Sequence, residues 1–575
     1  MVDEFLQESR VAYFSMEIAL CSEIPTYAGG LGVLAGDTLR AAADLGLPLV
    51  GVALVSRAGY FRQEIGADGS QQEHADFWDP ARWTRRLDAK VALRIEDRPV
   101  WIGAWLYVVT SHMGGRAPVI LLDTDLPENE PPDREITHYL YGGDDTYRLK
   151  QEMVLGMGGV RLLHALGFVI SAYHMNEGHS ALLGVELLRR YKYPLDDLRA
   201  GESPYDLPRV RELCRFTTHT PVESAHDRFP YDLVRRLFAS NAYANHGSEV
   251  DVTGKLPGPV DFALLQELGG PDGLNMTRLA LSSSDFVNGV AKRHAEVSAQ
   301  MYPGYAVRAI TNGVHPYTWT GASFRALYDR YVPGWCHEPE LLGRADAIPD
   351  EAVLAAHLEA KRTLMHRVEE LTGLVLDPAV ATLGFARRMT SYKRPDLLFS
   401  DLGELRAIAQ EQPLQIVLAG KAHPRDEEGK RLIVLLHERA RALAGSVAVA
   451  YLPNYDMALA QLLVGGCDVW VNTPLPPFEA SGTSGMKAAF NGVPSLSVPD
   501  GWWIEGCIEG MTGWSVDDAR ALYTKLRTVV LPQYYEQRTN SHFWARIMKS
   551  AITKNAPYFN SHRMMRRYAT EAYLR

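Results

Sequence analysis

The sequence predicts an α/β protein made of two Rossmann-like domains that face each other across a deep cleft. Short apolar runs alternate with helix-like segments, which is typical of buried parallel strands joined by helices. This alternation occupies the first half of the chain and starts again in the second half. The chain has 575 residues, and a single hydrophobic core stops growing well below that length, so two domains are expected.

Five apolar runs predict the strands of the first domain, at residues 11–15, 47–55, 119–122, 168–172 and 216–218. The first run is followed by a glycine-rich turn at residues 27–32, and the turn leads into a helix-like stretch over residues 33–45. Such a turn presents backbone N–H groups to an anion at the start of a helix. Glycine also permits tight turns for purely structural reasons, so the turn by itself leaves both interpretations open.

The second half repeats the strand signals at residues 381–385, 414–419, 447–451, 468–471 and 495–498, with helical patterns over 351–372, 430–437 and 457–463. Between the two halves, the strand signals give way to an irregular stretch near residues 312–316. We therefore expect a first domain over residues 1–315 and a second over 316–530. Residues 531–575 are helical in composition, and we expect them to cross back onto the first domain.

The composition excludes several classes of protein. It is 46% hydrophobic and 22% charged, and no apolar run approaches the roughly 20 residues that span a bilayer. The N-terminus lacks the pattern of a signal peptide, and five widely spaced cysteines argue against a disulfide framework, so we expect a cytoplasmic protein. A net charge of −10 disfavours nucleic acid and anionic lipid as partners.

A basic segment directly follows the first predicted strand of the second domain. Its four cations are Arg387, Arg388, Lys393 and Arg394. The carboxyl ends of strands border the cleft between two facing α/β domains, and arginine and lysine together can neutralise a bound phosphate. A solvated helix start is the alternative interpretation. The position at a strand end favours a phosphate site.

Residues 479–492 form a loop of small residues that leads into a helix and carries one carboxylate, Glu479, and one lysine, Lys487. In nucleotide-sugar glycosyltransferases with two Rossmann-like domains, a second carboxylate usually stands at this spacing. A lysine instead supplies an amine that can form a Schiff base with an aldehyde. We therefore predict that Lys487 is a pyridoxal phosphate site.

Several histidines and one asparagine follow predicted strands. His179, His219 and Asn312 are candidates for the cleft, although a strand-end histidine can also be a hydrogen-bonded core residue and Asn312 can belong to an ordinary turn. His174, His179, His219 and His226 follow two strand ends and do not have the spacing of a metal motif on one helix, so we predict no metal site. Tyr455 can pack beside the cofactor or in the core.

Four separated motifs resemble those of the α-glucan phosphorylases, the family of glycogen, starch and maltodextrin phosphorylases. In chain order they are the glycine turn 29–32, residues 311–313, the basic segment 388–394, and the loop 479–483 with Met486 and Lys487. The motifs cover both predicted domains. The resemblance therefore implies the GT-B fold, which consists of two Rossmann-like domains facing across an interdomain cleft.

The resemblance also implies a chemistry. Lys487 holds pyridoxal 5'-phosphate, and the phosphate of this cofactor, in place of its ring, takes part in the acid–base chemistry. Inorganic phosphate then lies between the cofactor phosphate and the α-1,4 glycosidic oxygen, to which it donates a proton. The glucosyl unit is trapped by the same phosphate as α-D-glucose 1-phosphate with retention. The implied partners are glycogen or maltodextrin, inorganic phosphate and glucose 1-phosphate, and a homodimer is left open.

Roles for individual residues follow from the same resemblance. Arg388 and Lys393 clamp the substrate phosphate, and the cofactor is bordered by Gly29, Gly30 and Tyr455. His219 and Asn312 hold the sugar 6-hydroxyl. Glu479, with the Ser481 and Gly482 backbone, binds the 3- and 4-hydroxyls, and Tyr392 binds the 2-hydroxyl. The catalytic candidates are Arg388, Lys393, His219 and Lys487, and the substrate contacts are Glu479, Ser481, Gly482, Thr483, Asn312, Tyr392, Leu31 and His179.

The sequence departs from the family pattern at two positions. Gly485 stands where asparagine is usual, and Thr390 stands where histidine is usual, which questions the fine geometry and the rate. The first strand comes almost at the start of the chain, so we expect an enzyme without the N-terminal control region of the animal phosphorylases.

Two other functions stay open. One is a glucan synthase that uses a nucleotide-glucose donor. It is opposed by Tyr27, where the synthases have lysine, and by Lys487, where they have a carboxylate. The other is an inactive glucan-binding homologue, which is opposed by the joint presence of Lys487, Arg388, Lys393 and Glu479.

Overall fold

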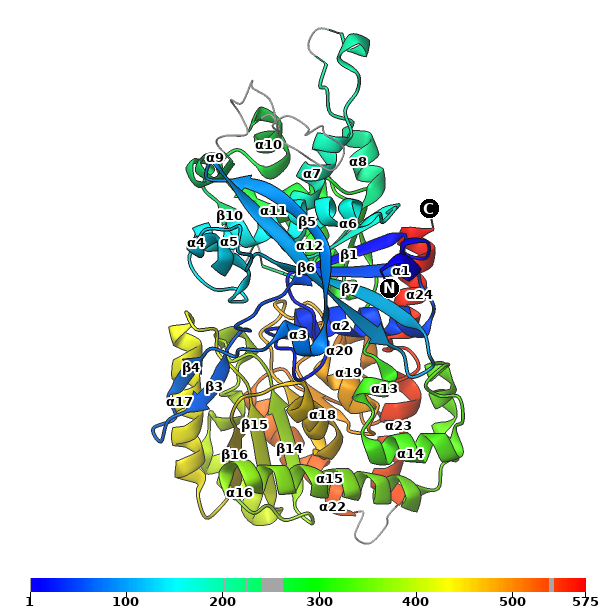
Figure 1. Cartoon of the computed structure of the whole chain (residues 1–575). Coiled ribbons are helices and arrows are strands. Elements are labelled where there is room, and N and C mark those ends of the chain that lie inside the picture. The colour runs from blue at the N-terminus through cyan, green and yellow to red at the C-terminus, as the bar shows by residue number, and fades with distance from the viewer. Residues whose placement is uncertain (1, 200–201, 223–225, 239–261, 537–541, 575) are drawn as a thin grey trace.

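The computed structural model describes residues 2–199, 202–222, 226–238, 262–536 and 542–574. Figure 1 shows two lobes stacked one above the other, each built around its own sheet with helices on it. The fold is α/β with large parallel sheets, as the sequence predicts. No helix in the described part of the chain is both long enough and apolar enough to cross a membrane.

The first lobe contains a sheet of nine described strands in the order β13-β12-β9-β8-β1-β2-β7-β6-β5. Neighbours from β13 to β7 are parallel, while β6 and β5 add as an antiparallel edge. The bounds are β1 Val11–Ser15, β2 Leu49–Leu54, β5 Arg85–Ile95, β6 Arg98–Thr110, β7 Arg116–Asp123, β8 Ala172–Asn176, β9 Cys214–Thr217, β12 Phe286–Gly289 and β13 Val307–Ala309.

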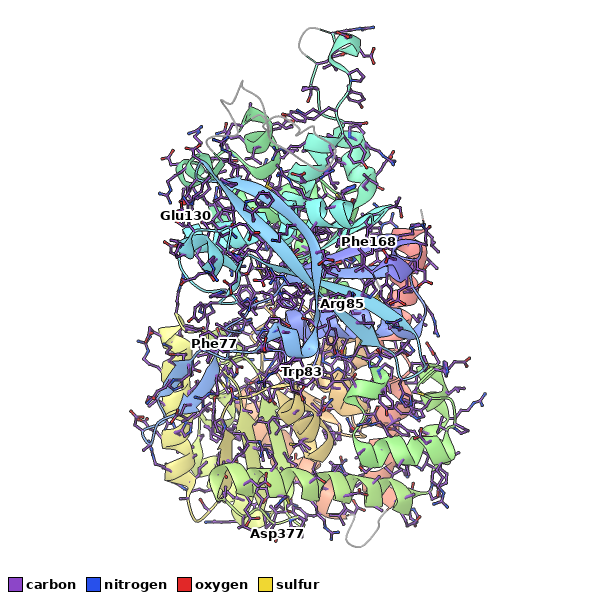
Figure 2. All side chains as sticks on the ribbon, in the orientation of Figure 1. Phe77, Trp83, Arg85, Glu130, Phe168 and Asp377 are labelled. Carbon is purple, nitrogen blue, oxygen red and sulfur yellow. The ribbon has the colours of Figure 1, made fainter. Side chains whose placement is uncertain are left out.

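Four of the five apolar runs predicted in the first half fall on strands, but the strand predicted at residues 168–172 is wrong. Helix α6 (Gly159–Leu166) ends at Gly167, which has a φ of 92°, and the chain joins the sheet only at Ala172. Phe168, which is labelled in Figure 2, and Ile170 are buried in the loop between them. The strand itself carries the polar residues His174 and Asn176, so its sequence is not a continuous apolar run. These two residues can be buried because side-chain hydrogen bonds satisfy them inside the core.

The second lobe contains a sheet of six described strands, all parallel, in the order β16-β15-β14-β17-β18-β19. The bounds are β14 Ala381–Ala386, β15 Leu414–Ala419, β16 Ala448–Leu452, β17 Val469–Asn472, β18 Ser495–Ser497 and β19 Gly513–Ser515. The strands that the sequence predicts in this half are all present within one or two residues, and β19 is additional. The predicted helices correspond to α15 (Asp350–Thr372), α17 (Glu427–Leu443) and α18 (Met457–Gly466).

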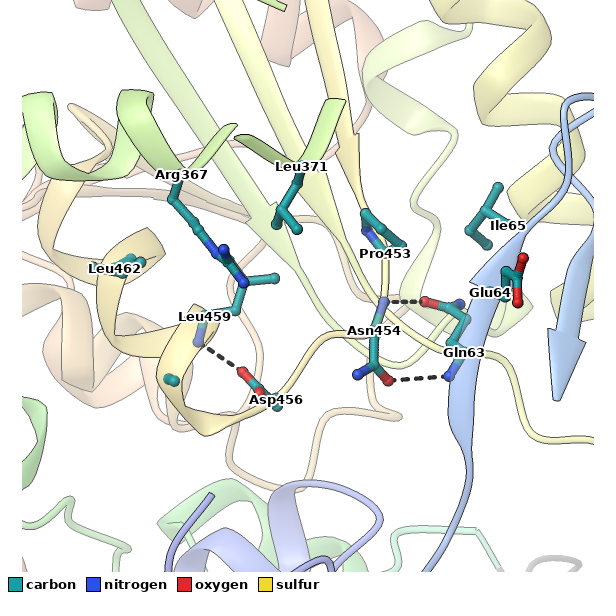
Figure 3. Close-up of a pocket in the computed structure, with 11 residues that line it drawn as sticks. Gln63, Glu64, Ile65, Arg367, Leu371, Pro453, Asn454, Asp456, Leu459 and Leu462 are labelled. Carbon is teal, nitrogen blue, oxygen red and sulfur yellow. Dashed lines mark hydrogen bonds between the residues drawn. The ribbon is translucent and has the colours of Figure 1, made fainter. Parts of the chain in front are cut away.

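A hairpin from the first half of the chain lies on the second lobe. Strands β3 (Arg62–Ile65) and β4 (Gln71–His74) sit beside α17 (Figure 1). Gln63 and Asn454 exchange two hydrogen bonds of 2.9 and 3.0 Å (Figure 3), and the Gln63 amide also donates to the carbonyl of Gly420 at 2.9 Å. Gln71 exchanges two further bonds with the backbone of Ala422. The hairpin therefore holds the turns that follow β15 and β16.

The C-terminal helices α23 (His542–Asn555) and α24 (Ser561–Tyr568) return from the second lobe to the first, where α24 packs against α2 (Gly30–Asp44). The Tyr573 hydroxyl lies 2.7 Å from His174 Nδ1 of β8, and the Asn288 amide donates to the Tyr568 hydroxyl at 2.9 Å. We propose the domain limits 1–315 and 316–530, with the last segment docked on the first lobe. The last strand of the first sheet ends at Ala309, and the second sheet begins at Ala381.

Candidate active site

A cavity of about 690 Å³ lies between the two lobes. Its walls are loops that follow β1, β8 and β9 in the first sheet and β14 to β17 in the second, which is where open α/β sheets bind ligands. The structure brings every predicted site residue to this cavity, although their individual roles stay predictions. The residues are Gly29, Gly30, Leu31, His179, His219, Asn312, Arg388, Tyr392, Lys393, Tyr455, Glu479, Ser481, Gly482, Thr483 and Lys487.

A carboxylate that the sequence analysis missed holds the glycine turn. Glu17 Oε2 accepts hydrogen bonds from the backbone N–H groups of Ala28 at 2.6 Å and Gly29 at 3.0 Å, and Oε1 accepts from the Tyr141 hydroxyl. A Cβ at Gly32 would lie 2.6 Å from Glu17 Oε2, so only glycine fits there. Helix α2 consequently begins at Gly30 on the cavity wall, where its N-terminus adds partial positive charge.

The opposite wall carries a buried ion-pair network around Glu479. Arg387 Nη2 and Lys393 Nζ both contact Glu479 Oε2, the lysine at 2.7 Å. Burial opposes the ionisation of Glu479, but the two cations outweigh it and lower its pKa to about 2. Burial and Arg387 lower the pKa of Lys393 to about 8. Arg387 Nη1 is buried and has no hydrogen-bond partner among the described residues. This arrangement keeps an N–H donor available for an anion.

Three of the four cations of the basic segment face the cavity, and the fourth does not. Arg394 Nε and Nη2 donate to the carbonyls of Thr473 and Pro474, so this side chain braces the turn after β17. Arg388 is exposed to the cavity, and its side chain has no hydrogen bond or ion pair with any part of the chain that the structure describes. A Cβ on Gly29 would lie 3.4 Å from Arg388 Nη2, so the glycine turn and Arg388 are neighbours across the cleft.

Lys487 lies in the short helix α19 (Ser484–Ala489), whose start forms part of the cavity wall. Its side chain is buried, and its Nζ lies 3.9 Å from the ring centroid of Trp319. Burial lowers the pKa of Lys487 to about 8, while Asp37 works in the opposite direction. A substantial fraction of this amine is therefore neutral near physiological pH, which a lysine needs for reaction with an aldehyde.

The first-lobe wall holds neutral histidines. His219 Nε2 lies 2.6 Å from Asn176 Oδ1, and the backbone N–H of His219 donates to Glu177 Oε2 at 2.8 Å. Burial lowers the pKa of His219 to about 3, so the ring is uncharged. Because Asn176 Nδ2 donates to Ser15, its Oδ1 accepts from His219 Nε2–H, and His219 Nδ1 is left as an acceptor.

His179 belongs to a separate group on the same wall. Its Nε2 lies 3.5 Å from Asp227 Oδ2, and Arg148 Nη2 donates to the same oxygen at 2.8 Å. Burial and Arg148 lower the pKa of His179 to about 3. Arg148 and Asp227 were not foreseen, since Arg148 lies inside helix α5 (Asp145–Met153) and Asp227 directly precedes the two-residue strand β10 (Arg228–Phe229). Glu17 and Glu177 were also missed, although each lies within two residues of the end of a strand.

Two of the predicted sugar contacts have buried oxygen atoms that lack a hydrogen-bond partner among the described residues. These atoms are Asn312 Oδ1 and Ser481 Oγ. A buried polar atom without a partner costs free energy unless a ligand or water satisfies it. Both residues line the cavity, so a ligand with several hydroxyl groups would meet this need.

The departure at Gly485 has a packing explanation. A Cβ at this position would lie 2.5 Å from the Trp502 ring and 3.0 Å from Ser495 Oγ, so the asparagine usual in the family would not fit beside Trp502. Thr390 is partly buried, and nothing in the structure explains the replacement of the usual histidine.

In the described part of the chain, one group has the residue types of a metal site: Asp44, His315 and His562. Asp44 Oδ2 lies 2.7 Å from His315 Nε2 and 2.8 Å from His562 Nε2, which are hydrogen-bond lengths. Two ligands of a tetrahedral zinc ion would stand about 3.3 Å apart. His315 Nδ1 also accepts from the Thr318 N–H, so the proton of a neutral His315 lies on Nε2. The group therefore joins α2, the 315 turn and α24 by hydrogen bonds.

The residues around Lys487 fit a cofactor that carries an aldehyde and a phosphate. The aldehyde needs an amine with a lowered pKa, and Lys487 provides it. The phosphate needs N–H donors and cations, which are present as Arg387 Nη1, Lys393 and the start of α2.

The chain is similar to several known proteins. The family model described as carbohydrate phosphorylase matches residues 168–512. The maltodextrin phosphorylase of Thermococcus litoralis is 38% identical over 98% of this chain and 70% of its own length. The glycogen phosphorylase of Aquifex aeolicus is 36% identical over 98% of this chain and 86% of its own. An uncharacterised protein of Methanocaldococcus jannaschii is 30% identical, with 98% and 99% of the two chains covered.

Proposed function

Since the chain belongs to the carbohydrate phosphorylase family, we propose that it is an α-glucan phosphorylase that transfers the terminal α-1,4-linked glucose of glycogen or maltodextrin to inorganic phosphate. The product is α-D-glucose 1-phosphate, formed with retention. One observation supports this proposal above the others: an amine of lowered pKa, Lys487, lies in the same cavity as the phosphate-binding groups Arg388 and Lys393.

The proposed cofactor is pyridoxal 5'-phosphate, attached through Lys487. When bound, it supplies a phosphate group that exchanges a proton with the substrate phosphate. Arg387 and Lys393 would hold this group, because Arg387 Nη1 has no other partner among the described residues and both side chains are already fixed by Glu479. The backbone of Gly29 and Gly30 at the start of α2 would face the same charge.

Arg388 is proposed to bind and orient the substrate phosphate. Its guanidinium faces the cavity, and no described side chain competes for it. A phosphate held there would stand next to the glycine turn, because Gly29 and Arg388 are close neighbours. The cations and the helix start together would offset the repulsion between two phosphates brought near each other.

The sugar is proposed to bind between the first-lobe wall and the loop that begins at Glu479. His219 Nδ1 and Asn312 Oδ1 can each accept a hydrogen bond from a hydroxyl group. Each residue is positioned by another of its atoms: His219 Nε2 bonds to Asn176, and the Asn312 backbone N–H donates to the carbonyl of Val290. Glu479 stays ionised at all physiological pH values, so it accepts hydrogen bonds from hydroxyl groups and does not act as an acid. Ser481, Gly482, Thr483, Tyr392, Leu31 and His179 complete the proposed contacts.

The proposal is tested with purified protein, maltodextrin and inorganic phosphate. We expect phosphate-dependent release of glucose 1-phosphate and an absorption band in the near ultraviolet to violet region. Lys487→Ala should abolish both, and Lys554→Ala, a change on helix α23 away from the cavity, should leave both intact. A colourless protein that releases a nucleoside diphosphate from a sugar nucleotide would instead be a glucan synthase.

Glucan binding without any formation of glucose 1-phosphate would identify an inactive homologue. This result, or the release of a nucleoside diphosphate from a sugar nucleotide, would overturn the proposal. A homodimer and a cytoplasmic location stay predictions.

A further inference from the structure

The amine of Lys487 rests on the face of a tryptophan. Trp319 ends the short helix α13 (Pro316–Trp319), is 1% exposed and lines the cavity. Lys487 Nζ lies 3.9 Å from its ring centroid, and this nitrogen donates no hydrogen bond to any described residue. An ammonium group over an indole ring is attracted by the negative face of the ring, and tryptophan is the strongest partner of this kind. The amine of Lys487 is therefore held by a cation–π contact with the Trp319 ring.

The ring is itself held in place from the first lobe. Trp319 Nε1 donates to Asp37 Oδ2 of α2 at 2.8 Å, and Asp37 is also fully buried. The Arg40 guanidinium lies 3.5 Å from the other oxygen of Asp37, so the carboxylate has a fixed orientation. A hydrogen bond from the indole N–H to a carboxylate also enriches the ring in electrons, which strengthens its attraction for a cation.

One amide ties the tryptophan to the lysine. Asn491 Nδ2 donates to the carbonyl of Trp319 at 2.8 Å and to the carbonyl of Lys487 at 3.0 Å, and Asn491 Oδ1 accepts from the Gly321 N–H. Asn491 is completely buried. The backbones of Trp319 and Lys487 are therefore fixed relative to each other by the Asn491 side chain.

We propose that Trp319 is a positioning residue for the reactive lysine: its face holds the Lys487 amine, and Asp37 fixes the angle of that face. This role rests on the proposed function in so far as Lys487 attaches the cofactor. The contact between amine and indole can be tested without the cofactor.

The contact has a measurable consequence. The ring face and the charge of Asp37 both favour the ammonium form, while burial favours the neutral amine. Removal of either favourable contact should lower the pH at which the amine loses half its charge. A buried contact of this kind corresponds to a shift of about half to one pH unit.

The experiment measures the labelling of Lys487 by an amine-selective reagent as a function of pH, with the site resolved by mass spectrometry. The full chain is first treated with hydroxylamine to remove any bound aldehyde. The midpoint should fall by about half to one unit in Trp319→Leu and Asp37→Asn, and by less in Trp319→Phe, which keeps a ring. The matched control is Trp335→Phe, since Trp335 is also 1% exposed and also donates its indole N–H to a carboxylate, Asp329, at 2.8 Å.

An unchanged midpoint in folded Trp319→Phe and Asp37→Asn protein, or an equal shift in Trp335→Phe, would overturn the inference. These two variants keep the test decisive where Trp319→Leu fails to fold, and the melting temperature of each variant reports on folding.

A second readout is the rate at which added pyridoxal phosphate develops its bound absorption band. We expect this rate to change in the Trp319 variants and not in Trp335→Phe. Wild-type protein that never binds pyridoxal phosphate would refute the proposed function while leaving the midpoint comparison valid. Normal binding in all variants with no shift in midpoint would refute only the role of Trp319.

Discussion

The two walls of the cavity differ in the sign of their charge. The second-lobe wall has an excess of cations over carboxylates: Arg387, Arg388, Lys393, Lys421, Arg425 and Lys487 against Asp456 and Glu479. The first-lobe wall has the reverse excess, since Arg148 stands against Glu17, Asp144, Asp145, Glu177 and Asp227. An anion is therefore attracted to one wall and repelled by the other. This difference supports the proposal that phosphate groups bind mainly against the second-lobe wall and an uncharged sugar mainly against the first-lobe wall.

The walls also differ in how they respond to pH. The second wall contains amines whose pKa is lowered by burial to about 8, namely Lys393, Lys421 and Lys487. The histidines of the first wall, His179 and His219, have pKa values lowered by burial to about 3. Between about pH 4 and 7 neither wall changes its charge through these groups. Above about pH 8 only the second wall does.

The largest effect is expected when Arg388 on the second-lobe wall is replaced. Arg388→Gln should reduce kcat/KM for phosphate by about 100- to 1000-fold, because the cation proposed to bind and orient the substrate phosphate is lost. Steady-state kinetics with phosphate as the varied substrate measure it, and Arg431→Gln, an exposed change on α17, is the control. Equal losses for phosphate and for glucan would show that the walls are not specialised.

A smaller loss is expected from the first wall. Asn312→Ala and His219→Ala should each reduce kcat/KM for maltodextrin by about 10- to 100-fold, since each removes a hydroxyl contact of about 1–3 kcal/mol. The dissociation constant of phosphate, measured by calorimetry, should stay within about twofold. A large change in phosphate affinity would place these residues on the phosphate side and break the comparison.

The pH dependence sharpens the comparison further. A lysine with a pKa of about 8 is charged below that pH and loses its charge above it, so the KM for phosphate should rise by up to about tenfold between pH 8 and 9.5. Phosphate is already mostly a dianion over this range. The KM for maltodextrin should not rise, because the first-wall histidines are neutral throughout. Parallel rises in both constants would argue against the assignment.

The smallest effect is expected from the hairpin that joins the walls. Gln63→Met removes three side-chain hydrogen bonds: one to Gln71 within the hairpin, and two that hold the turns after β15 and β16. These turns carry Lys421 and Tyr455. We expect a loss of about 1–3 kcal/mol in the free energy of unfolding and a rise of a few-fold in the KM for phosphate. Gln72→Met, an exposed change on β4, should alter neither. A similar result for both variants would mean that the hairpin does not position the second wall.

The regular elements were well predicted where burial alone decides them. The second sheet is covered on both faces, so its strands are near-continuous apolar runs, and the predicted segments fall on β14 to β18. The antiparallel edge strands β5 and β6 were missed, because they mix exposed charged residues with apolar ones over 11 and 13 residues. The polar strand β8 was misplaced for a related reason, since its His174 and Asn176 are buried only because distant hydroxyl groups satisfy them.

The sequence by itself determined the fold class, the family and part of the cavity wall, because strand-end positions and the motif around Lys487 are local features. It did not indicate Glu17, Arg148, Glu177 or Asp227. Only the tertiary structure decided which cations of the basic segment face the cavity. Arg388 faces the cavity, while Arg394 in the same segment braces a turn. The structure also decided that Lys487 rests on Trp319, 168 positions earlier (487 − 319), and that Asp37 of the other lobe orients the ring. The physical reason is that a pKa, an ion pair and a ring contact depend on burial and on neighbours brought together from distant parts of the chain.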